Sequence, residues 1–471
     1  MVLRPLNEAI PEYLLAYVVQ QDASLYTPMD HASWRFILKI ARQFFAHNAH
    51  QAYLDGLRET GISTERIPLI SEMDACLRKF NWRTAAVSGF IPPAVFMEFL
   101  ARGILPIACD MRKMENLAYT PAPDIVHEAA GHAPIIADPG YAQYLRHYGE
   151  LAEKAIYSAQ DLEVYNAVRV LSDVKEDPLS TDEQVAAAQN RLDRASASVD
   201  HDTEATQLGR MGWWTIEYGL IGDEKNPKIY GAGLLSSVGE SFHCLKPEVR
   251  KVPLTRQCVD QTYDITRPQP QLFVASDFAS MTRVLDDFGQ TMAYRRGGLE
   301  GLEKARRAAV ATTAVLDSGI QISGTLTRYA ANPQPYYLKF DGPTQLSFAD
   351  QELVGQGPAH HREGFSTVLG PIRNQNGRSP AELSESELNQ LGFADPSRPG
   401  RMEFESGVVL EGRLTNRIAR GGKNLVLTFQ DCRVSHGPET LFDPGWGVFD
   451  LACGSQVVSV FGGAKTGKMD S

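Results

Sequence analysis

Residues 120–134 read TPAPDIVHEAAGHAP and contain the side chains of a candidate metal site, His127, Glu128 and His132. In the zinc-protease pattern the two histidines lie four residues apart on one face of a helix, whereas here they lie five apart. At about 100° per residue, a regular α-helix would separate their side chains by about 140°. Joint ligation therefore favours a π-type bulge, a helix end or imidazoles that reach across the gap, and Gly131 makes a local irregularity less costly. The alternative is two buried histidines that are hydrogen-bonded to carbonyl groups.

A candidate third ligand, Glu217, lies in the apolar run WWTIEYG at residues 213–219. A glutamate in such surroundings is expected to be buried and paired, or bound to a metal. Two neutral imidazoles and one carboxylate, with open positions opposite them, suit an Fe(II) ion that binds and activates O₂. The alternative is an ion pair between Glu217 and an arginine such as Arg210.

The composition limits the class of protein that could carry this site. The 471 residues are enough for two or three domains. With 46 Lys+Arg against 57 Asp+Glu, the net charge of −11 argues against a nucleic-acid binder and gives no reason to expect attachment to an anionic membrane. The six cysteines form no CxxC pair, and neither the N-terminus nor the apolar stretch 85–109 resembles a signal peptide or a bilayer span. We therefore expect a cytoplasmic protein.

The hydrophobic periodicity changes along the chain. Helical spacing is present at residues 30–45, with Asp30 as the expected N-cap, and again at 141–157, 161–174 and 302–316. Alternating segments at 320–327, 408–414, 424–429 and 456–460 predict strands, and the Gly/Pro-rich stretch 355–401 predicts long loops. The adjacent pair His360 and His361 in this stretch is interpreted as exposed and incidental.

These patterns predict the following domain organisation. Residues 1–300 form a mostly α domain in which the polar segment 177–205 is an exposed helical insertion. The resemblance described below implies that this domain is catalytic and that the insertion spans about 157–210. Residues 301–317 form a helical linker, and residues 318–471 form a small all-β C-terminal domain of unknown role.

Three motifs in the same order, at residues 120–134, 213–219 and 230–240, together resemble the tetrahydropterin-dependent aromatic amino acid hydroxylases. The resemblance spans about residues 26–297 and is nearest to the bacterial phenylalanine 4-monooxygenases. It implies that His127, His132 and Glu217 hold a single Fe(II) ion. It also implies that Glu128 lies beside the pterin and the metal-bound water.

The same resemblance assigns residues to the amino-acid pocket. Arg112 matches the arginine that pairs with the substrate carboxylate, a role that suits a bidentate guanidinium group. The alternative for Arg112 is an exposed salt bridge with Glu115. Thr120 and Ser236 match positions that complete the pocket by hydrogen bonding, although capping of a turn or helix would also explain them.

Two further positions match the pterin-binding loop of the family. Gly89 and Phe96 lie in the segment SGFIPPAVF, and Phe96 would stack on the pterin ring. A phenylalanine in an apolar run could equally be an ordinary core residue.

The preference for one aromatic ring follows from three positions. Trp213 and Gly239 match the members that hydroxylate phenylalanine or tyrosine, since tryptophan-hydroxylating members have a smaller phenylalanine at the first position. Ile265 occupies a position that is acidic in tyrosine hydroxylases, and an apolar side chain cannot bond a ring hydroxyl group. Phenylalanine is therefore the expected substrate.

The expected activity is hydroxylation of L-phenylalanine to L-tyrosine with Fe(II), O₂ and a tetrahydropterin, either tetrahydrobiopterin or a bacterial analogue. Three alternatives remain: a tryptophan hydroxylase of the same family, a zinc-dependent hydrolase that uses His127, Glu128 and His132, and a non-catalytic binding protein. The expected metabolic partner is a pterin carbinolamine dehydratase, and the C-terminal domain is expected to self-associate. Val238 departs from the family motif and could alter the pocket floor.

Overall fold

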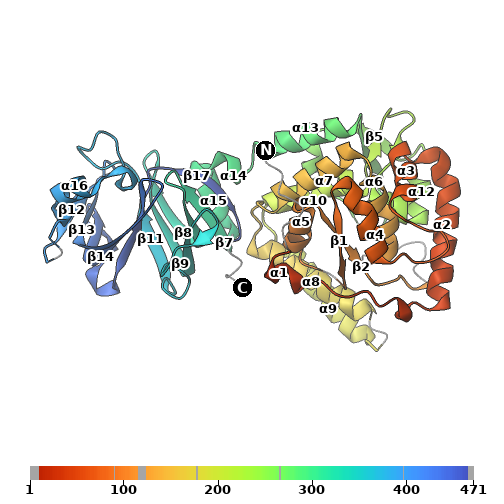
Figure 1. Cartoon of the computed structure of the whole chain (residues 1–471), viewed down its shortest axis with the longest axis horizontal. Coiled ribbons are helices and arrows are strands. Elements are labelled where there is room, and N and C mark those ends of the chain that lie inside the picture. The colour runs from red at the N-terminus through yellow and green to blue at the C-terminus, as the bar shows by residue number, and fades with distance from the viewer. Residues whose placement is uncertain are drawn as a thin grey trace. The chain divides into compact units, whose positions relative to one another are not determined.

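The computed structural model describes residues 10–89, 91–114, 124–176, 179–264, 267–395 and 397–464, and the chain forms two compact units (Figure 1). The first unit comprises Met1–Glu153 and Gln160–Gly289, and the second comprises Lys154–Ala159 and Gln290–Ser471. The second unit thus starts before residue 300. It also includes the short segment Lys154–Ala159, which interrupts the first unit along the sequence.

The long helix α2 (Pro28–Asn48) shows how the apolar spacing of the first unit is used, because it buries Trp34, Ile37, Leu38 and Phe45. Its N-cap is Thr27, not Asp30 as expected from the sequence. The Thr27 side chain accepts a hydrogen bond from the backbone N–H of Asp30, and the Asp30 carboxylate accepts one from the N–H of Thr27. This capping box places the helix start three residues earlier and puts Pro28 in the first turn, where its missing N–H costs nothing.

The first unit is mostly helical in the part that the structure describes. Its further helices are α1 (Glu12–Leu15), α3 (Gln51–Glu59), α4 (Ile70–Leu77), α5 (Pro93–Ala101), α6 (Ala133–Ile135), α7 (Pro139–Ala152), α8 (Ala159–Glu176), α9 (Asp182–Ser198), α10 (Glu204–Gly212), α11 (Ala232–Ser236), α12 (Val238–His243) and α13 (Phe278–Gly289). None of the described helices combines the length and the apolar character that a bilayer crossing requires.

Two small sheets accompany these helices. One is the parallel pair β1 (Arg83–Val87) and β2 (Ile104–Ala108). The other has the order β4-β3-β6-β5, formed by β3 (Leu220–Ile221), β4 (Lys228–Ile229), β5 (Arg250–Pro253) and β6 (Gln271–Ala275). The strands β3, β5 and β6 are parallel to one another, and β4 is antiparallel to β3.

Helices α8 and α9 form a hairpin where the insertion is expected (Figure 1). Arg191 forms an ion pair with Glu163, and Gln160 donates to the carbonyl of Ser198 at the base of the hairpin. Within α9 the buried residues are two alanines, Ala188 and Ala195.

The second unit is built from two antiparallel sheets. One has the order β10-β9-β8-β7-β17 with β11 paired to β9, and the other has the order β12-β13-β14-β15 with β16 paired to β14. The strands are β7 (Ala311–Leu316), β8 (Ile320–Ala331), β9 (Pro335–Phe348), β10 (Gln351–Glu352), β11 (Gly364–Val368), β12 (Gly400–Glu403), β13 (Val408–Arg420), β14 (Lys423–His436), β15 (Glu439–Phe442), β16 (Phe449–Ala452) and β17 (Val457–Gly462).

The expected helical linker at residues 301–317 differs from the structure. Helix α15 (Gly298–Ala308) ends at Ala309, which has the left-handed φ of 54° that often terminates a helix. The following residues form β7, which pairs with both β8 and β17 inside the six-stranded sheet. This segment is therefore integral to the second unit, which also contains α14 (Ala293–Arg296).

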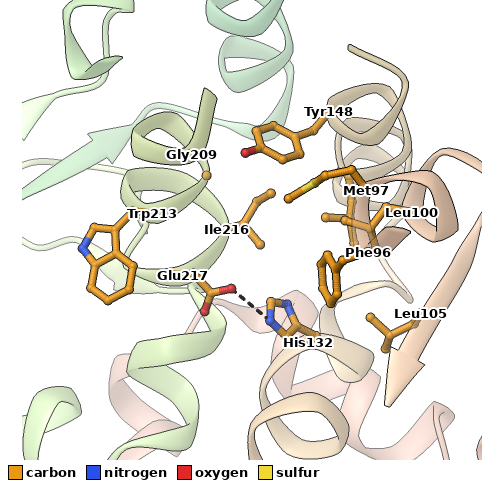
Figure 2. A pocket seen from close by; sticks show the side chains of 12 residues that line it. Phe96, Met97, Leu100, Leu105, His132, Tyr148, Gly209, Trp213, Ile216 and Glu217 are labelled. Atoms are coloured by element: carbon orange, nitrogen blue, oxygen red, sulfur yellow. Dashed lines mark ion pairs between the residues drawn. The ribbon is translucent and has the colours of Figure 1, made fainter. Parts of the chain in front are cut away.

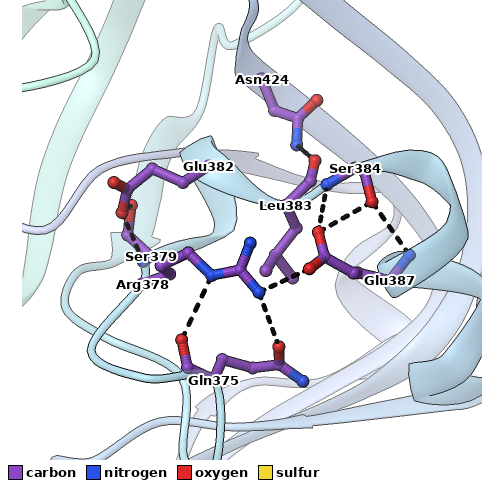
Figure 3. A network of polar contacts seen from close by, with 8 residues as sticks. All are labelled: Gln375, Arg378, Ser379, Glu382, Leu383, Ser384, Glu387 and Asn424. Carbon is purple, nitrogen blue, oxygen red and sulfur yellow. Dashed lines mark hydrogen bonds and ion pairs between the residues drawn. The ribbon is translucent and has the colours of Figure 1, made fainter.

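The Gly/Pro-rich stretch contains short elements that polar contacts hold in place (Figure 3). Besides β11 it includes the short helix α16 (Glu385–Leu388), whose N-cap Ser384 forms a capping box with Glu387. Arg378 donates to Glu387 Oε1 at 2.5 Å, and the buried Asn424 of β14 donates to the carbonyl of Leu383 at 2.8 Å. The side chains of Asn424 and Ser384 thus satisfy backbone groups of this stretch, the carbonyl of Leu383 and the N–H of Glu387.

Candidate active site

His127 and His132 lie on a π-helix, Val126–His132. Because a π-helix bonds residues five apart, it brings the two imidazoles to the same side, which is one of the arrangements that the spacing favours for joint ligation. Their Nε2 atoms are 3.1 Å apart, and the ring planes are nearly perpendicular at 88°. Gly131 makes the close packing possible, since a Cβ atom there would lie 2.8 Å from the carbonyl oxygen of Ala232 in α11.

Glu217 ends a second π-helix, Trp213–Glu217, and its carboxylate faces both histidines. Its oxygens lie 3.1 Å from His132 Nε2 and 3.4 Å from His127 Nε2, and Figure 2 shows the contact with His132. Ligands about 2 Å from one ion at right angles are about 3 Å apart, so these three atoms fit one face of a metal's coordination sphere. The proposed ion pair of Glu217 with Arg210 is wrong, because Arg210 pairs with Asp202.

The charges of these three side chains are strongly coupled. Burial disfavours ionisation of Glu217, but the imidazoles of His132 and His127 outweigh it and lower the pKa of Glu217 to about 2. Burial also disfavours a charged His132, yet the Glu217 carboxylate raises the pKa of His132 to about 9. For His127 burial dominates and lowers the pKa to about 4. A cation bound here would therefore replace a proton held between His132 and Glu217.

Glu128 follows His127 on the first π-helix and is 4% exposed. Its Oε2 atom is 3.9 Å from His132 Nε2 and has no hydrogen-bond partner among the described residues. Burial raises the pKa of Glu128 to about 8. By distance, Glu217 is the better third ligand, since both of its oxygens approach an imidazole more closely.

Ser236 orients the first histidine. The hydroxyl oxygen of Ser236 is 2.9 Å from His127 Nδ1. If Nδ1 donates this hydrogen bond, the lone pair of Nε2 is free to face Glu217 and a metal ion. Ser236 is buried at the end of α11, and its carbonyl accepts a hydrogen bond from Arg112 Nη1 at 3.1 Å.

Arg112 is buried and is held by Asp124. Its Nε and Nη2 atoms donate to the two carboxylate oxygens of Asp124, each at 2.7 Å. The same carboxylate accepts a hydrogen bond from the backbone N–H of His127. Three of the five N–H groups of Arg112 thus have acceptors among the described residues, and two remain for another ligand.

A mostly apolar pocket of about 140 Å³ adjoins His132 and Glu217 (Figure 2). Phe96 and Met97 of α5 lie across it from Trp213 and Ile216 of the second π-helix. The other lining residues are Leu100, Leu105, Leu145, Tyr148, Gly209 and Gly212. The aromatic and aliphatic lining suits an apolar ring beside the candidate metal ligands.

Trp213 is fixed between two tyrosines. Its ring stacks on Tyr218 and Tyr263 at centroid distances of 4.3 and 4.2 Å. The stacking limits how far this wall of the pocket can move.

The remaining predicted positions lie outside this pocket lining or outside the described residues. Gly89 is exposed, has a φ of 62°, and donates its N–H to Asp110 at 3.1 Å. Val238 and Gly239 begin α12. Thr120, Glu115 and Ile265 lie outside the described residues.

The family profile of the biopterin-dependent aromatic amino acid hydroxylases matches residues 13–163 and 174–297, more than half of the chain. The chain belongs to this family. The interruption in the match, residues 164–173, lies within α8 of this hydroxylase.

Several phenylalanine-4-hydroxylases are similar to this family member. That of Pseudomonas aeruginosa is 28% identical over 264 residues, which cover 56% of this chain and 84% of the relative. That of Chromobacterium violaceum is 27% identical over 285 residues, 58% of this chain and 81% of the relative. A crystal structure of the C. violaceum phenylalanine hydroxylase with iron(III) and 7,8-dihydrobiopterin has a TM-score of 0.47 and 24% identity, over 60% of this chain and 92% of that one.

Sequence reasoning missed Asp124 as well as most of the aliphatic and glycine residues that line the pocket. Asp124 anchors Arg112 and also bonds the backbone N–H of His127, three residues further along the chain. An aspartate three residues before a helical N–H is a common N-cap arrangement, and this was the available signal.

Proposed function

We propose that this hydroxylase converts L-phenylalanine into L-tyrosine with Fe(II), a tetrahydropterin and O₂. The observation that carries the proposal is the triangle of His127 Nε2, His132 Nε2 and Glu217 oxygens beside an apolar pocket. Family membership and the similarity to bacterial phenylalanine-4-hydroxylases support the substrate and cofactor. When bound, the iron and the reduced pterin together activate O₂ for transfer of one oxygen atom to the ring.

The side chains of this chain supply ligands and position the reactants. His127, His132 and Glu217 would hold the iron on one face and leave the other face open. Ser236 would fix the ring of His127 through its hydroxyl group. Glu128 would hold a proton on its buried carboxyl group and offer a hydrogen bond to the pterin or to a water molecule.

The amino acid would be held at both ends. Arg112, oriented by Asp124, has two N–H groups left for the substrate carboxylate. Trp213 would form the wall against the aromatic ring, and Phe96 would stack on the pterin. Gly89 and Thr120 would complete the pterin loop and the amino-acid pocket, respectively. The apolar lining excludes water, which strengthens the polar contacts at the metal.

The direct test is an oxygen-consumption assay with Fe(II), a reduced tetrahydropterin and phenylalanine, tyrosine or tryptophan in turn. We expect tyrosine from phenylalanine only when iron and pterin are both present. His132→Ala should abolish the reaction, whereas His436→Ala in the second unit serves as the matched control and should retain it. Faster turnover of tryptophan than of phenylalanine, or hydrolysis supported by zinc without pterin, would overturn the proposal.

We further propose the cellular setting that this chemistry implies. A pterin carbinolamine dehydratase would remove water from the hydroxypterin product, which is the first step of pterin recycling. A cytoplasmic location is supported by the six cysteines, all of which are free thiols. Self-association through the second unit is supported by its exposed Trp446 and Val448, which are 65% and 45% exposed.

A further inference from the structure

The second unit contains another cluster of potential metal ligands, formed by His360, His361 and Asp450. The two histidines lie in the segment 353–363 between β10 and β11, and Asp450 lies on β16. The sequence interpretation of both histidines as exposed is wrong for His361, whose side chain is 8% exposed, while that of His360 is 45% exposed. The side chain of Asp450 is 2% exposed.

Both imidazoles face the same carboxylate oxygen. His360 Nε2 is 2.8 Å from Asp450 Oδ2, and His361 Nε2 is 3.9 Å from it. Gln356 Oε1 lies 2.8 Å from His361 Nε2 and adds a fourth polar atom. One ligand atom from each histidine and from Asp450 can be chosen so that all three lie within 4.8 Å of one another.

The backbone holds the two histidines in place. The N–H groups of His360 and His361 both donate to the carbonyl of Gly357, at 3.0 and 3.2 Å. The carbonyl of His361 accepts a hydrogen bond from Thr344 of β9. The segment is thus tied to the six-stranded sheet before any ion binds, which reduces the entropy lost on binding.

Asp450 is held in place by residues of the other sheet, the one that contains β14 and β16. Its strand β16 pairs with β14, and Asp450 Oδ1 accepts a hydrogen bond from the hydroxyl of Thr428 at 2.5 Å. Among the described residues, the ion-pair contacts of Asp450 are with the two histidines and include no lysine or arginine. A buried carboxylate requires a counter-charge or hydrogen bonds, and a divalent cation would supply the charge.

We propose that His360, His361 and Asp450 bind a Zn²⁺ ion. Two imidazole nitrogens and one carboxylate oxygen are a ligand set that zinc favours, with Gln356 Oε1 or a water molecule as the fourth ligand. The partly exposed His360 provides the entry path. The ion would link the segment 353–363 to β16 and thereby join the two sheets of the second unit, independently of the proposed hydroxylase activity.

The test measures how many zinc ions bind per full-length chain. The site in the first unit also has two histidines and a carboxylate, so it is expected to bind zinc as well. Chelator-treated protein is titrated with Zn²⁺ alone, and bound metal is measured by calorimetry and elemental analysis. We expect two ions for the wild type, one for His360→Ala, one for His132→Ala and none for the double variant. His436→Ala, in the same unit but away from Asp450, is the matched control and should bind two.

The affinity at the second site should fall by more than about 100-fold in His360→Ala, since loss of a direct ligand exceeds the usual effect of losing a supporting residue. A variant that binds zinc with unchanged stoichiometry and affinity would overturn the proposal. If His360→Ala fails to fold by circular dichroism, Asp450→Asn replaces it, since the amide keeps the shape of the carboxylate and removes its charge.

A second readout identifies the ligands. Cobalt(II) added to His132→Ala should give weak visible ligand-field bands and no thiolate-to-metal charge-transfer absorption. Thiolate absorption, or no bound ion in His132→Ala, would mean that these three residues form an ordinary hydrogen-bonded cluster and not a zinc site.

Discussion

Arg112 and Asp124 form a buried ion pair with two hydrogen bonds in the interior of the first unit, and their side chains are 1% and 4% exposed. Asp124→Asn leaves the guanidinium charge without a counter-charge, and such a loss in a buried pair costs about 3–5 kcal/mol. We expect the free energy of unfolding to fall by this amount and the KM for phenylalanine to rise. Denaturant unfolding and steady-state kinetics measure the two effects.

The control for this prediction is Asp202→Asn, which breaks the more exposed pair of Asp202 with Arg210. Its expected cost is under about 1 kcal/mol, with no change in KM. Equal losses of free energy of unfolding in the two variants would contradict the claim that breaking the buried pair costs more.

Ser236 and His127 provide a test of how the metal ligand is oriented. Ser236→Ala removes the oxygen that lies 2.9 Å from His127 Nδ1, and loss of such a supporting contact lowers metal affinity by about 10–100-fold. Iron-binding titrations measure the change. Ser241→Ala removes a hydroxyl that donates to the carbonyl of Val238 and has no hydrogen bond to a histidine within the described part of the chain, so it should leave affinity unchanged.

Metal binding should release a proton near neutral pH. In the apoprotein, the carboxylate of Glu217 more than offsets the effect of burial and raises the pKa of His132 to about 9. At pH 7, binding of Fe(II) should therefore displace about one proton, and the apparent affinity should rise until the pH passes about 9. Anaerobic calorimetry in buffers of different ionisation enthalpy counts the protons, and a value of zero would contradict the prediction.

The same pair makes the stability of the apoprotein depend on pH. A raised pKa for His132 gives stabilisation that is fully present below about 6.5 and is lost as the pH rises through about 9. A pKa of about 2 for Glu217 gives stabilisation that is present above about 4.5 and is lost as the pH falls through about 2. The free energy of unfolding of the apoprotein should therefore be greatest between about pH 4.5 and 6.5. Glu217→Gln should make this free energy depend less on pH.

Gly131 tests the packing of the first π-helix. In Gly131→Ala the new methyl group would meet the carbonyl oxygen of Ala232 at 2.8 Å, and overpacking of this kind costs about 1–3 kcal/mol. Gly209→Ala in α10 is the control, because no atom lies within 4 Å of the added methyl group. The free energy of unfolding of that control, measured by thermal or denaturant unfolding, should rise by about 0.4–1 kcal/mol.

Trp213 is expected to limit the size of the substrate ring. Trp213→Phe enlarges the pocket wall, so the ratio of kcat/KM for tryptophan to that for phenylalanine should rise about tenfold or more. Trp214→Phe is the control, since Trp214 is buried, donates to the carbonyl of Gln261 and does not line the pocket. An unchanged ratio in Trp213→Phe would assign ring selection to other residues.

The sequence alone determined the features that depend on neighbours along the chain. If His127 and His132 share a metal ion, their five-residue spacing favours a local helical irregularity, and the structure has a π-helix there. Alternating residues predicted parts of β8, β13, β14 and β17. The family resemblance, which is confirmed, rests on three contiguous motifs.

The tertiary structure decided the contacts between distant segments. The sequence left two possible partners for Glu217, a metal ion or Arg210. The tertiary structure decides between them, because it places the Glu217 oxygens against both histidines. Asp450 likewise lies 90 positions from His360, and no local pattern relates them. Periodicity reports which face of an element is buried, but which side chains then meet depends on how the elements pack together.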